Sequence, residues 1–311
     1  MAILILIKSA TGNYKKRELL RSTWANRTYL SRLRFPIEFA FLVGVGQFEK
    51  AGSIPMELKQ ETEDHNDMVW MEHVDTYRNN TYKTLGGMKW AAEYCPNFEF
   101  AMTVDDDMYL STGNVIKFLR NPMAYPREGS ITGTPCEFSQ FGFAINPNEL
   151  FYAGTVMGGD IWLPERKDQN HFCLKTISKI VRLMMVITSD HFAGLGRSKN
   201  VITFSDYPFS KFPFYPTGAA VIYSRQAIKY IYIAAPFVKF LSIDDVYVGI
   251  VAAKLEIPLV DLRDWIAFAA FNKWKNGCAN RVKTRDCNET VIAIHWCGME
   301  ESLREFWKKY N

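Results

Sequence analysis

Apolar residues gather along the chain into short runs separated by polar segments that contain glycine, proline or asparagine. Runs of strand length predict buried strands; they lie at Ala2–Lys8, Ile37–Val43, Phe98–Val104 and Tyr215–Ser224. Apolar residues at helical spacing predict helices; they lie at about Tyr14–Trp24, Tyr82–Tyr94, Gln226–Ile233, Asp245–Leu255 and Met299–Tyr310. Because strands and helices alternate, we expect an α/β fold with a mostly parallel sheet flanked by helices.

One predicted strand ends at a cluster of carboxylates, because Asp105, Asp106 and Asp107 follow Val104 directly. Adjacent carboxylates repel one another and cannot be buried without partners. The spacing of Asp105 and Asp107 lets two carboxylates point to the same side of an extended segment. Such hard oxygen ligands suit Mg²⁺ or Mn²⁺ bound together with a nucleotide's phosphates. An exposed acidic turn is the alternative, but parallel sheets bind ligands beyond their carboxyl ends, which favours a metal–diphosphate site.

A second acidic pair, Asp244 and Asp245, stands at the start of a predicted helix. Aspartate is favoured there by the unpaired N–H groups of the first turn, so capping alone explains one of the two. The other can project into a cleft and act as a general base. His295 follows an apolar segment, and its position alone is typical of a hydrogen-bonded core histidine rather than a ligand.

Composition narrows the class of protein without identifying it. The chain has 311 residues, 48% of them hydrophobic, which excludes disorder and allows one large domain or two fused lobes. Its net charge of +4 comes from scattered basic residues, so nucleic acid is not an expected partner. No apolar run approaches about 18 residues, and the segment MAILILIKS is expected to be a buried first strand rather than a targeting signal.

The cysteines and glycosylation sequons bear on the compartment. The six cysteines include no CxxC pair, which argues against a structural zinc site, and their even number permits disulfides. Six cysteines allow fifteen pairings, so the sequence leaves the connectivity open. Three sequons begin at Asn26, Asn79 and Asn288. Together these features favour the secretory pathway.

The motifs in order resemble the β-1,3-glycosyltransferases of glycosyltransferase family 31. The resemblance is carried by LILIKSATGNYKKRELLRSTWAN, FAFLVG, ETEDHNDMVWMEHVDTYRNNTYKTLGGMKW, CPNFEFAMTVDDDMYL, GRSKN, YPFSKFPFYPTGAAVIYS, IDDVYVGIVAAKLEIP and HWCGMEESLREFWKKY. It covers the chain from Ala2 to about Tyr125 and from Gly196 to the end. Each motif alone is weak, but eight in the right order are highly specific.

The resemblance implies a single catalytic domain with the GT-A nucleotide-sugar-binding fold, residues 1–125 forming the donor half and 126–311 the acceptor half. It also implies roles for individual residues. Asp107 is expected to ligate Mn²⁺ with His295 as a second ligand, and Asp245 is expected to be the base. Residues expected to bind or surround the donor are Asp105, Asp106, Arg17, Arg21, Asp75 and Lys83.

The activity implied is inverting transfer of galactose or N-acetylglucosamine from a UDP-sugar to the 3-hydroxyl of a glycan on a glycoprotein or glycolipid. Asp245 would take the hydroxyl proton while Mn²⁺ offsets charge on the departing UDP. The family also implies a place in the Golgi lumen, with a membrane anchor that is missing from this chain.

The segment 157–197 departs from the family pattern, because it separates a G-x-V strand from the R-x-S-K loop by an atypical insertion. An insertion beside the donor site suggests an alternative function, namely a catalytically silent relative that binds glycans or partner enzymes. A metal-dependent phosphatase is a third possibility. It is disfavoured because Tyr109 stands where the phosphatase motif D-x-D-x-[TV] has threonine or valine.

Overall fold

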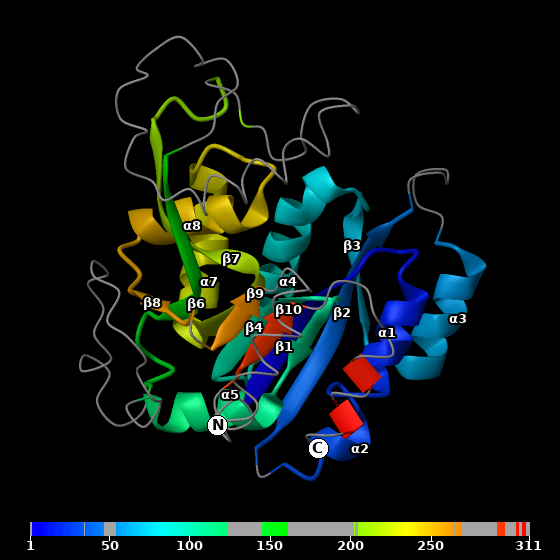
Figure 1. Ribbon diagram of the computed structural model, residues 1–311. Helices are drawn as coiled ribbons and strands as arrows, with labels where there is room; N and C mark the ends of the chain where they lie inside the picture. The colour runs from blue at the N-terminus through cyan, green and yellow to red at the C-terminus, as the bar shows by residue number, and fades with distance from the viewer. Residues whose placement is uncertain are drawn as a thin grey trace, which may run out of the picture.

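The computed structural model describes most of the chain and places a mixed sheet at its centre (Figure 1). The described residues are 2–33, 35–46, 54–122, 145–160, 202, 205–263, 265–268, 291–295, 303–304 and 307–308. Within them, the main sheet has seven strands in the order β3-β2-β1-β4-β7-β6-β8. These strands are β1 Ile3–Lys8, β2 Ile37–Val45, β3 Met68–Val74, β4 Phe100–Asp105, β6 Tyr152–Asp160, β7 Lys211–Ser224 and β8 Leu259–Asp261.

Strand directions confirm the expectation of a mostly parallel sheet. Strands β1 to β4 are parallel to one another, and β8 is parallel to β6. Strand β7 alone runs against its neighbours β4 and β6. The carboxyl ends of β1, β4 and β6 therefore lie at one edge of the sheet, which we call the carboxyl edge.

A smaller sheet brings a remote segment to this edge. It has the order β5-β10-β9 and consists of β5 Met108–Leu110, β9 Ile266–Phe268 and β10 Ala293–His295. Strands β10 and β5 are antiparallel, and His295 pairs with Met108. His295 therefore lies opposite the residue that follows Asp107, although the two are far apart in the sequence.

Helices cover both faces of the main sheet. They are α1 Tyr14–Arg21, α2 Arg27–Leu30, α3 Met56–His65, α4 Asn80–Tyr94, α5 Thr112–Arg120, α7 Arg225–Ala234 and α8 Asp244–Lys254, with the short 3₁₀ helices η1 Tyr77–Asn79 and η5 Ala235–Phe237. Ile3, Ile5 and Ile7 of β1 join a core with α1 and α5, whereas Leu4 and Leu6 join a core with α4, α7 and α8. The central strand is therefore apolar on both faces, as its uninterrupted apolar run indicates.

Several element boundaries differ from the sequence prediction. Helix α1 ends at Arg21 rather than Trp24, whose indole N–H donates to the carbonyl of Met108 at 2.9 Å. Strand β6 continues to Asp160, so the first residues of the segment 157–197 belong to the sheet. The remainder of that segment lies outside the described residues, as does most of the predicted closing helix Met299–Tyr310.

Few described features bear on the compartment. None of the helices in the described ranges combines the length and apolar character that a membrane crossing requires. Cys95 is a free thiol, and the other cysteines lie outside the described residues. In the first sequon, the Asn26 side chain caps α2 by accepting the N–H of Tyr29 at 3.0 Å, and its amide donates to the carbonyl of Arg21 at 3.2 Å. This asparagine is therefore engaged in the fold.

Candidate active site

Lys8 joins the two acidic motifs at the carboxyl edge. It is the last residue of β1 and pairs in register with Asp105 of β4. Its ammonium lies 2.9 Å from Asp105 Oδ1 and 2.8 Å from Asp244 Oδ2, and its side chain is 5% exposed. Burial alone would lower the pKa of Lys8, but the two carboxylates outweigh that effect and hold it above its ordinary value. The two acidic motifs, which sequence analysis treated separately, therefore lie together at one site.

Asp106 holds the loop between β1 and α1. Its buried carboxylate accepts hydrogen bonds from Ser9 Oγ at 2.8 Å, Asn13 Nδ2 at 2.7 Å and Lys16 Nζ at 3.0 Å. These three protein donors occupy a side chain that the resemblance had assigned to the donor substrate. The contacts thus give Asp106 a structural part in shaping the loop, and they leave Asp105, which is about one third exposed, as the carboxylate of the two nearer to solvent.

Asp107 and His295 are adjacent, as the family resemblance implies. His295 Nε2 lies 3.4 Å from Asp107 Oδ1, and their side chains are 29% and 31% exposed. The Asp107 Oδ1 atom is itself buried and makes no hydrogen bond. Burial alone would raise the pKa of Asp107, but His295 and Lys16 outweigh it and hold the pKa below its ordinary value. The carboxylate is therefore ionised, and its Oδ1 faces His295 without a hydrogen bond.

This pair fits a divalent ion. Ligand atoms that each lie about 2.1 Å from one metal ion are at most about 4.2 Å apart, and the observed nitrogen–oxygen separation of 3.4 Å is within that limit. The described residues contain no group of three His, Cys, Asp or Glu side chains arranged around a common point. A metal held by this pair would thus take its remaining ligands from the phosphates of a nucleotide or from water.

Asp75 and Lys83 brace the same loop from the other side. Lys83 Nζ donates to Asp75 Oδ1 at 2.7 Å and to the carbonyl of Ser9 at 2.7 Å. Asp75 Oδ2 accepts the backbone N–H of Thr11 at 3.0 Å. Burial lowers the pKa of Lys83, although Asp75 opposes that shift. The pair lies near the predicted donor site and fixes the loop backbone there.

Arg17 and Arg21 enter a different arrangement from the one expected. All five N–H donors of Arg17 are used, two of them on Glu61 of α3 and the others on Ser9 Oγ and the carbonyls of Ala10 and Thr11. Arg17 is 0% exposed. With every N–H donor used inside the protein, Arg17 positions the loop, and its expected role at the donor stays a prediction.

Arg21 is similarly engaged. It makes two hydrogen bonds to Asp67, at 2.9 and 2.8 Å, and further ones to Glu18 and Glu61. The guanidinium also lies over the ring of Phe41, 4.9 Å from its centroid. Arg21 thus ties α1 to α3 and to the start of β3.

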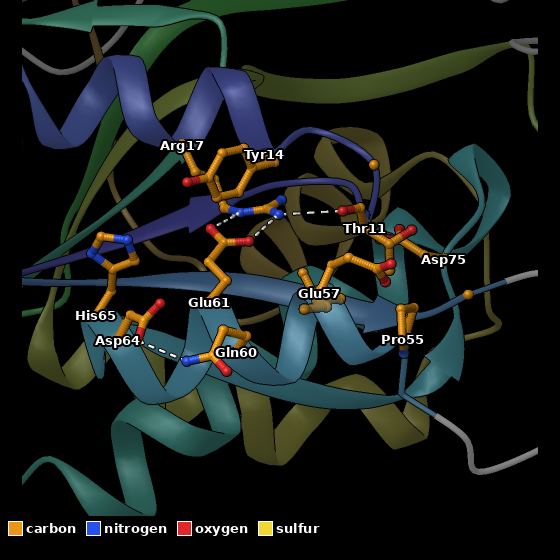
Figure 2. Close-up of a pocket in the computed structure, with 13 residues that line it drawn as sticks. Thr11, Tyr14, Arg17, Pro55, Glu57, Gln60, Glu61, Asp64, His65 and Asp75 are labelled. Carbon is orange, nitrogen blue, oxygen red and sulfur yellow. Dashed lines mark hydrogen bonds and ion pairs between the residues drawn. The ribbon is translucent and has the colours of Figure 1, made fainter.

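A pocket of about 880 Å³ opens between this loop, α1 and α3 (Figure 2). Its lining residues are Thr11, Gly12, Tyr14, Arg17, Gly46, Pro55, Glu57, Leu58, Gln60, Glu61, Asp64, His65 and Asp75. Thr11 and Gly12 face the pocket, whereas Ser9 and Asn13 of the same loop contact Asp106. The pocket and the acidic cluster are therefore separated by one loop.

Asp244 and Asp245 have different environments although they are neighbours in the first turn of α8. Asp244 accepts hydrogen bonds from Lys8 and from Thr84 Oγ1, both at 2.8 Å, and these outweigh burial and lower its pKa. Asp245 instead accepts hydrogen bonds from the backbone N–H groups of Val246, at 2.8 Å, and Gly218, at 3.2 Å. Burial, reinforced by Asp244, raises the pKa of Asp245 to about 6. Divergent environments of this kind separate a permanent anion from a titrating base.

Sequence analysis missed four residues of this site. They are Lys8, Lys16, Glu61 and Gly218. A signal existed for Lys8, because a charged residue ends an otherwise apolar run. A weaker signal existed for Glu61, because it begins the acidic ETEDHND segment. Their partners are remote in sequence, so only the fold reveals the contacts.

Comparison with known proteins identifies the family. Beta-1,3-galactosyltransferase brn of Drosophila melanogaster is 28% identical over 99% of this chain and 74% of its own length. Beta-1,3-galactosyltransferase 2 of Mus musculus is 26% identical over 98% of this chain, which spans 57% of that relative. Among solved structures, the galactosyltransferase LgtC in complex with donor and acceptor sugar analogs aligns over 99% of this chain and 96% of its own, with 9% identity and a TM-score of 0.38.

A family model described as galactosyltransferase matches residues 15–145 and 174–263, which is more than half of the chain. The matched residues include Asp105 to Asp107, Asp244 and Asp245. The chain belongs to this galactosyltransferase family and is a glycosyltransferase.

Proposed function

We propose that the protein is an inverting β-1,3-hexosyltransferase that moves galactose or N-acetylglucosamine from a UDP-sugar to a glycan acceptor on a glycoprotein or glycolipid. Family membership and relatives named as β-1,3-galactosyl- and N-acetyl-β-D-glucosaminyltransferases support this proposal. The observation that carries it is the gathering of two acidic motifs at one edge of the sheet, where Lys8 joins Asp105 to Asp244 and His295 of β10 lies beside Asp107. These residues come from remote parts of the chain.

Asp107 and His295 are the side chains that would hold Mn²⁺. The buried oxygen of Asp107 without a hydrogen bond supports this assignment, because an ionised oxygen is rarely left without a partner. When bound, the ion supplies a Lewis acid that offsets the negative charge of the leaving diphosphate. Lys16, 3.6 Å from Asp107 Oδ2, adds a second positive charge beside the same carboxylate.

Asp245 is the proposed general base. With a pKa of about 6 it is ionised at neutral pH and still basic enough to accept a proton. In the proposed step, its carboxylate removes the proton of the acceptor 3-hydroxyl, the hydroxyl oxygen forms a bond to the anomeric carbon, and the bond from that carbon to the diphosphate oxygen breaks. UDP leaves with the electron pair. Attack opposite the leaving group inverts the anomeric configuration.

The test separates chemistry from donor binding. A panel of UDP-sugars with Mn²⁺ is assayed for transfer, and nucleotide binding is followed by the rise in melting temperature that UDP and Mn²⁺ produce. Asp245→Asn is expected to lower the transfer rate by about 10²–10⁴-fold while keeping that rise. Glu93→Gln, an exposed carboxylate on α4 bonded to Tyr232, serves as the matched control. Loss of nucleotide binding in Asp245→Asn would remove the proposed role.

The same assays also test the alternative function, a catalytically silent relative that binds glycans or partner enzymes. A protein that gains stability with UDP and Mn²⁺, yet transfers no sugar from the panel to any acceptor, would favour the silent alternative. We propose a Golgi lumenal location because the family resemblance implies it. Localisation of a tagged full-length protein measures this directly.

A further inference from the structure

Lys8 is buried between the donor-side and acceptor-side acids, and the reaction proposed above gives it no direct part. We propose that Lys8 is a positioning residue that fixes Asp245 relative to the donor site, acting through Asp244 and the backbone of Gly218. This inference rests on the proposed role of Asp245 as base. In this role Lys8 sets the distance and orientation between the base and the diphosphate end of the site.

The contacts of Lys8 form a three-way junction. Its ammonium has three N–H donors, and they meet Asp105 Oδ1 at 2.9 Å, Asp244 Oδ2 at 2.8 Å and the carbonyl of Gly218 at 3.0 Å. These acceptors belong to β4, α8 and β7, respectively. With all three donors used and the side chain 5% exposed, Lys8 is engaged inside the protein rather than presented to substrate. It therefore links the end of β4, two residues before Asp107, to the helix that carries Asp245.

Gly218 completes the link to the base. The carbonyl of Gly218 accepts from Lys8, and its N–H donates to Asp245 Oδ2 at 3.2 Å. A Cβ atom at this position would lie 3.3 Å from both Lys8 Nζ and Asp245 Cβ, and 3.5 Å from Asp244 Oδ2. The two contacts at 3.3 Å are tighter than those of most Cβ atoms, so a side chain at this position would require Lys8 or Asp245 to shift by a few tenths of an ångström. The glycine thus allows the close approach on which the junction depends.

Charge gives the junction a measurable consequence. The groups facing Asp245 are Asp244 on its own helix, Lys8 on β1, Tyr215 and Tyr223 on β7, and Tyr77 on η1. Lys8 is the cation in this set. Removing its charge leaves Asp244 and Asp105 without a counter-ion beside Asp245, so Asp245 holds its proton more tightly and titrates at higher pH. A purely structural lysine elsewhere would not move this titration.

The experiment compares Lys8→Met, Lys8→Arg and the double variant Lys8→Met with Asp244→Asn. We measure kcat and KM against pH, together with the melting-temperature rise on UDP and Mn²⁺ and the far-UV spectrum. Lys8→Met is expected to lower kcat about 10–100-fold, change the donor KM less than about threefold, and shift the acid limb of kcat to higher pH. The double variant removes one negative charge together with the positive one. The acid limb of its kcat against pH is therefore expected to return toward that of the unmodified protein. Lys8→Arg keeps the positive charge, so the acid limb of its kcat is expected at the same pH as in the unmodified protein.

Two further variants keep the outcome decisive. Gly218→Ala leaves every charge in place and is expected to lower kcat, because its Cβ displaces Lys8 or Asp245; it serves if Lys8→Met does not fold. Lys229→Met, on the exposed part of α7, is the matched control and is expected to behave as the unmodified protein. A folded Lys8→Met with unchanged kcat and acid limb would overturn the inference, and so would an unfolded Lys8→Met accompanied by a Gly218→Ala of normal kcat. If Asp245→Asn still transfers sugar, the base assignment itself fails, whatever Lys8 does.

Discussion

Two groups of charged residues flank the loop between β1 and α1, and they differ in how fully their hydrogen bonds are used. Arg17, Arg21, Glu61 and Asp67 form a buried network in which each guanidinium meets two carboxylates or a carboxylate and loop carbonyls. Across the loop, Asp107 keeps an oxygen without a hydrogen bond. Charged groups whose hydrogen bonds are all made inside the protein hold its shape, whereas an oxygen without a hydrogen bond is available to a ligand.

The same contrast separates two neighbours on α8. Asp244 is bonded to Lys8 and Thr84, whereas Asp245 meets backbone N–H groups and titrates near neutral pH. Family resemblance alone assigned the arginines and the aspartates to one functional set. Hydrogen bonding divides that set into residues whose polar atoms are satisfied inside the protein and residues that keep capacity for a ligand or a proton, and the following predictions test that division.

The largest effect is expected from Asp107→Asn. Loss of an outer-shell partner of a metal site costs about 10–100-fold in metal affinity or activity, and loss of a ligand should cost more. We expect transfer to become undetectable, and the melting-temperature rise on UDP to lose its dependence on Mn²⁺. Isothermal calorimetry of UDP with and without Mn²⁺ measures this directly. Glu149→Gln, a carboxylate bonded to Asn146, is the control; metal-dependent UDP binding that survives in Asp107→Asn would contradict the assignment.

Breaking the satisfied network should affect folding first. Arg17→Met leaves Glu61 buried with only Arg21 as a cationic partner and frees the loop carbonyls, and loss of one partner of a buried ion pair costs about 3–5 kcal/mol. Urea unfolding of Arg17→Met against Lys15→Met, an exposed site two residues earlier, measures the difference. A variant of normal stability that has lost only donor affinity would show that Arg17 binds the substrate after all.

Asp245→Asn should stabilise the protein while removing activity. A carboxyl whose pKa is raised from about 4 to about 6 on folding is more easily ionised when unfolded, so its contribution to stability is lost as pH rises through this window. Its replacement should therefore raise the free energy of unfolding by about 2–3 kcal/mol at pH 7 and by little at pH 4. Chemical denaturation at both pH values measures the change in the free energy of unfolding and tests whether it grows with pH. Equal changes at both would show that Asp245 is not the group that titrates.

The smallest effect is expected at the rim of the network. Glu18 is 38% exposed and pairs with Arg21 at 2.7 Å and with His65 at 3.2 Å. Exposed ion pairs contribute about 0–1 kcal/mol and weaken with salt. Glu18→Gln should therefore lower stability by less than about 1 kcal/mol, and the difference should vanish in about 1 M salt. A loss comparable to that of Arg17→Met would mean that the network extends to the surface.

The sequence alone predicted the strongly apolar elements well. Strands β1, β4 and β7 and helices α4, α7 and α8 lie where their patterns place them, with boundary shifts of a few residues. Helix α3 and strand β3 were not predicted, because MELKQETEDH carries few apolar residues and MVWMEHV is mostly half-buried. A weak pattern cannot distinguish these segments from loops. The mostly parallel sheet with aspartates at its carboxyl edge agrees with the GT-A arrangement that the resemblance implied.

Within the site, the sequence indicated residue types better than contacts. The three aspartates and Asp245 were singled out from spacing and position, and the structure places them at one edge. His295 was interpreted as a core residue from spacing and as a ligand from resemblance; its proximity to Asp107 depends on the pairing of β10 with β5. The pairing of β10 with β5 and the ion pair of Arg17 with Glu61 both join segments that are far apart along the chain. No local sequence pattern predicts such contacts.

The antiparallel pairing of β6 and β7 has a consequence for how this family can diversify. Asp160 is paired with Lys211, so the intervening residues depart from and return to the same point, at the carboxyl edge. Closing a longer loop between two fixed ends costs little additional entropy. A change in the length of the connection between Asp160 and Lys211 can therefore occur without disturbing the two strands.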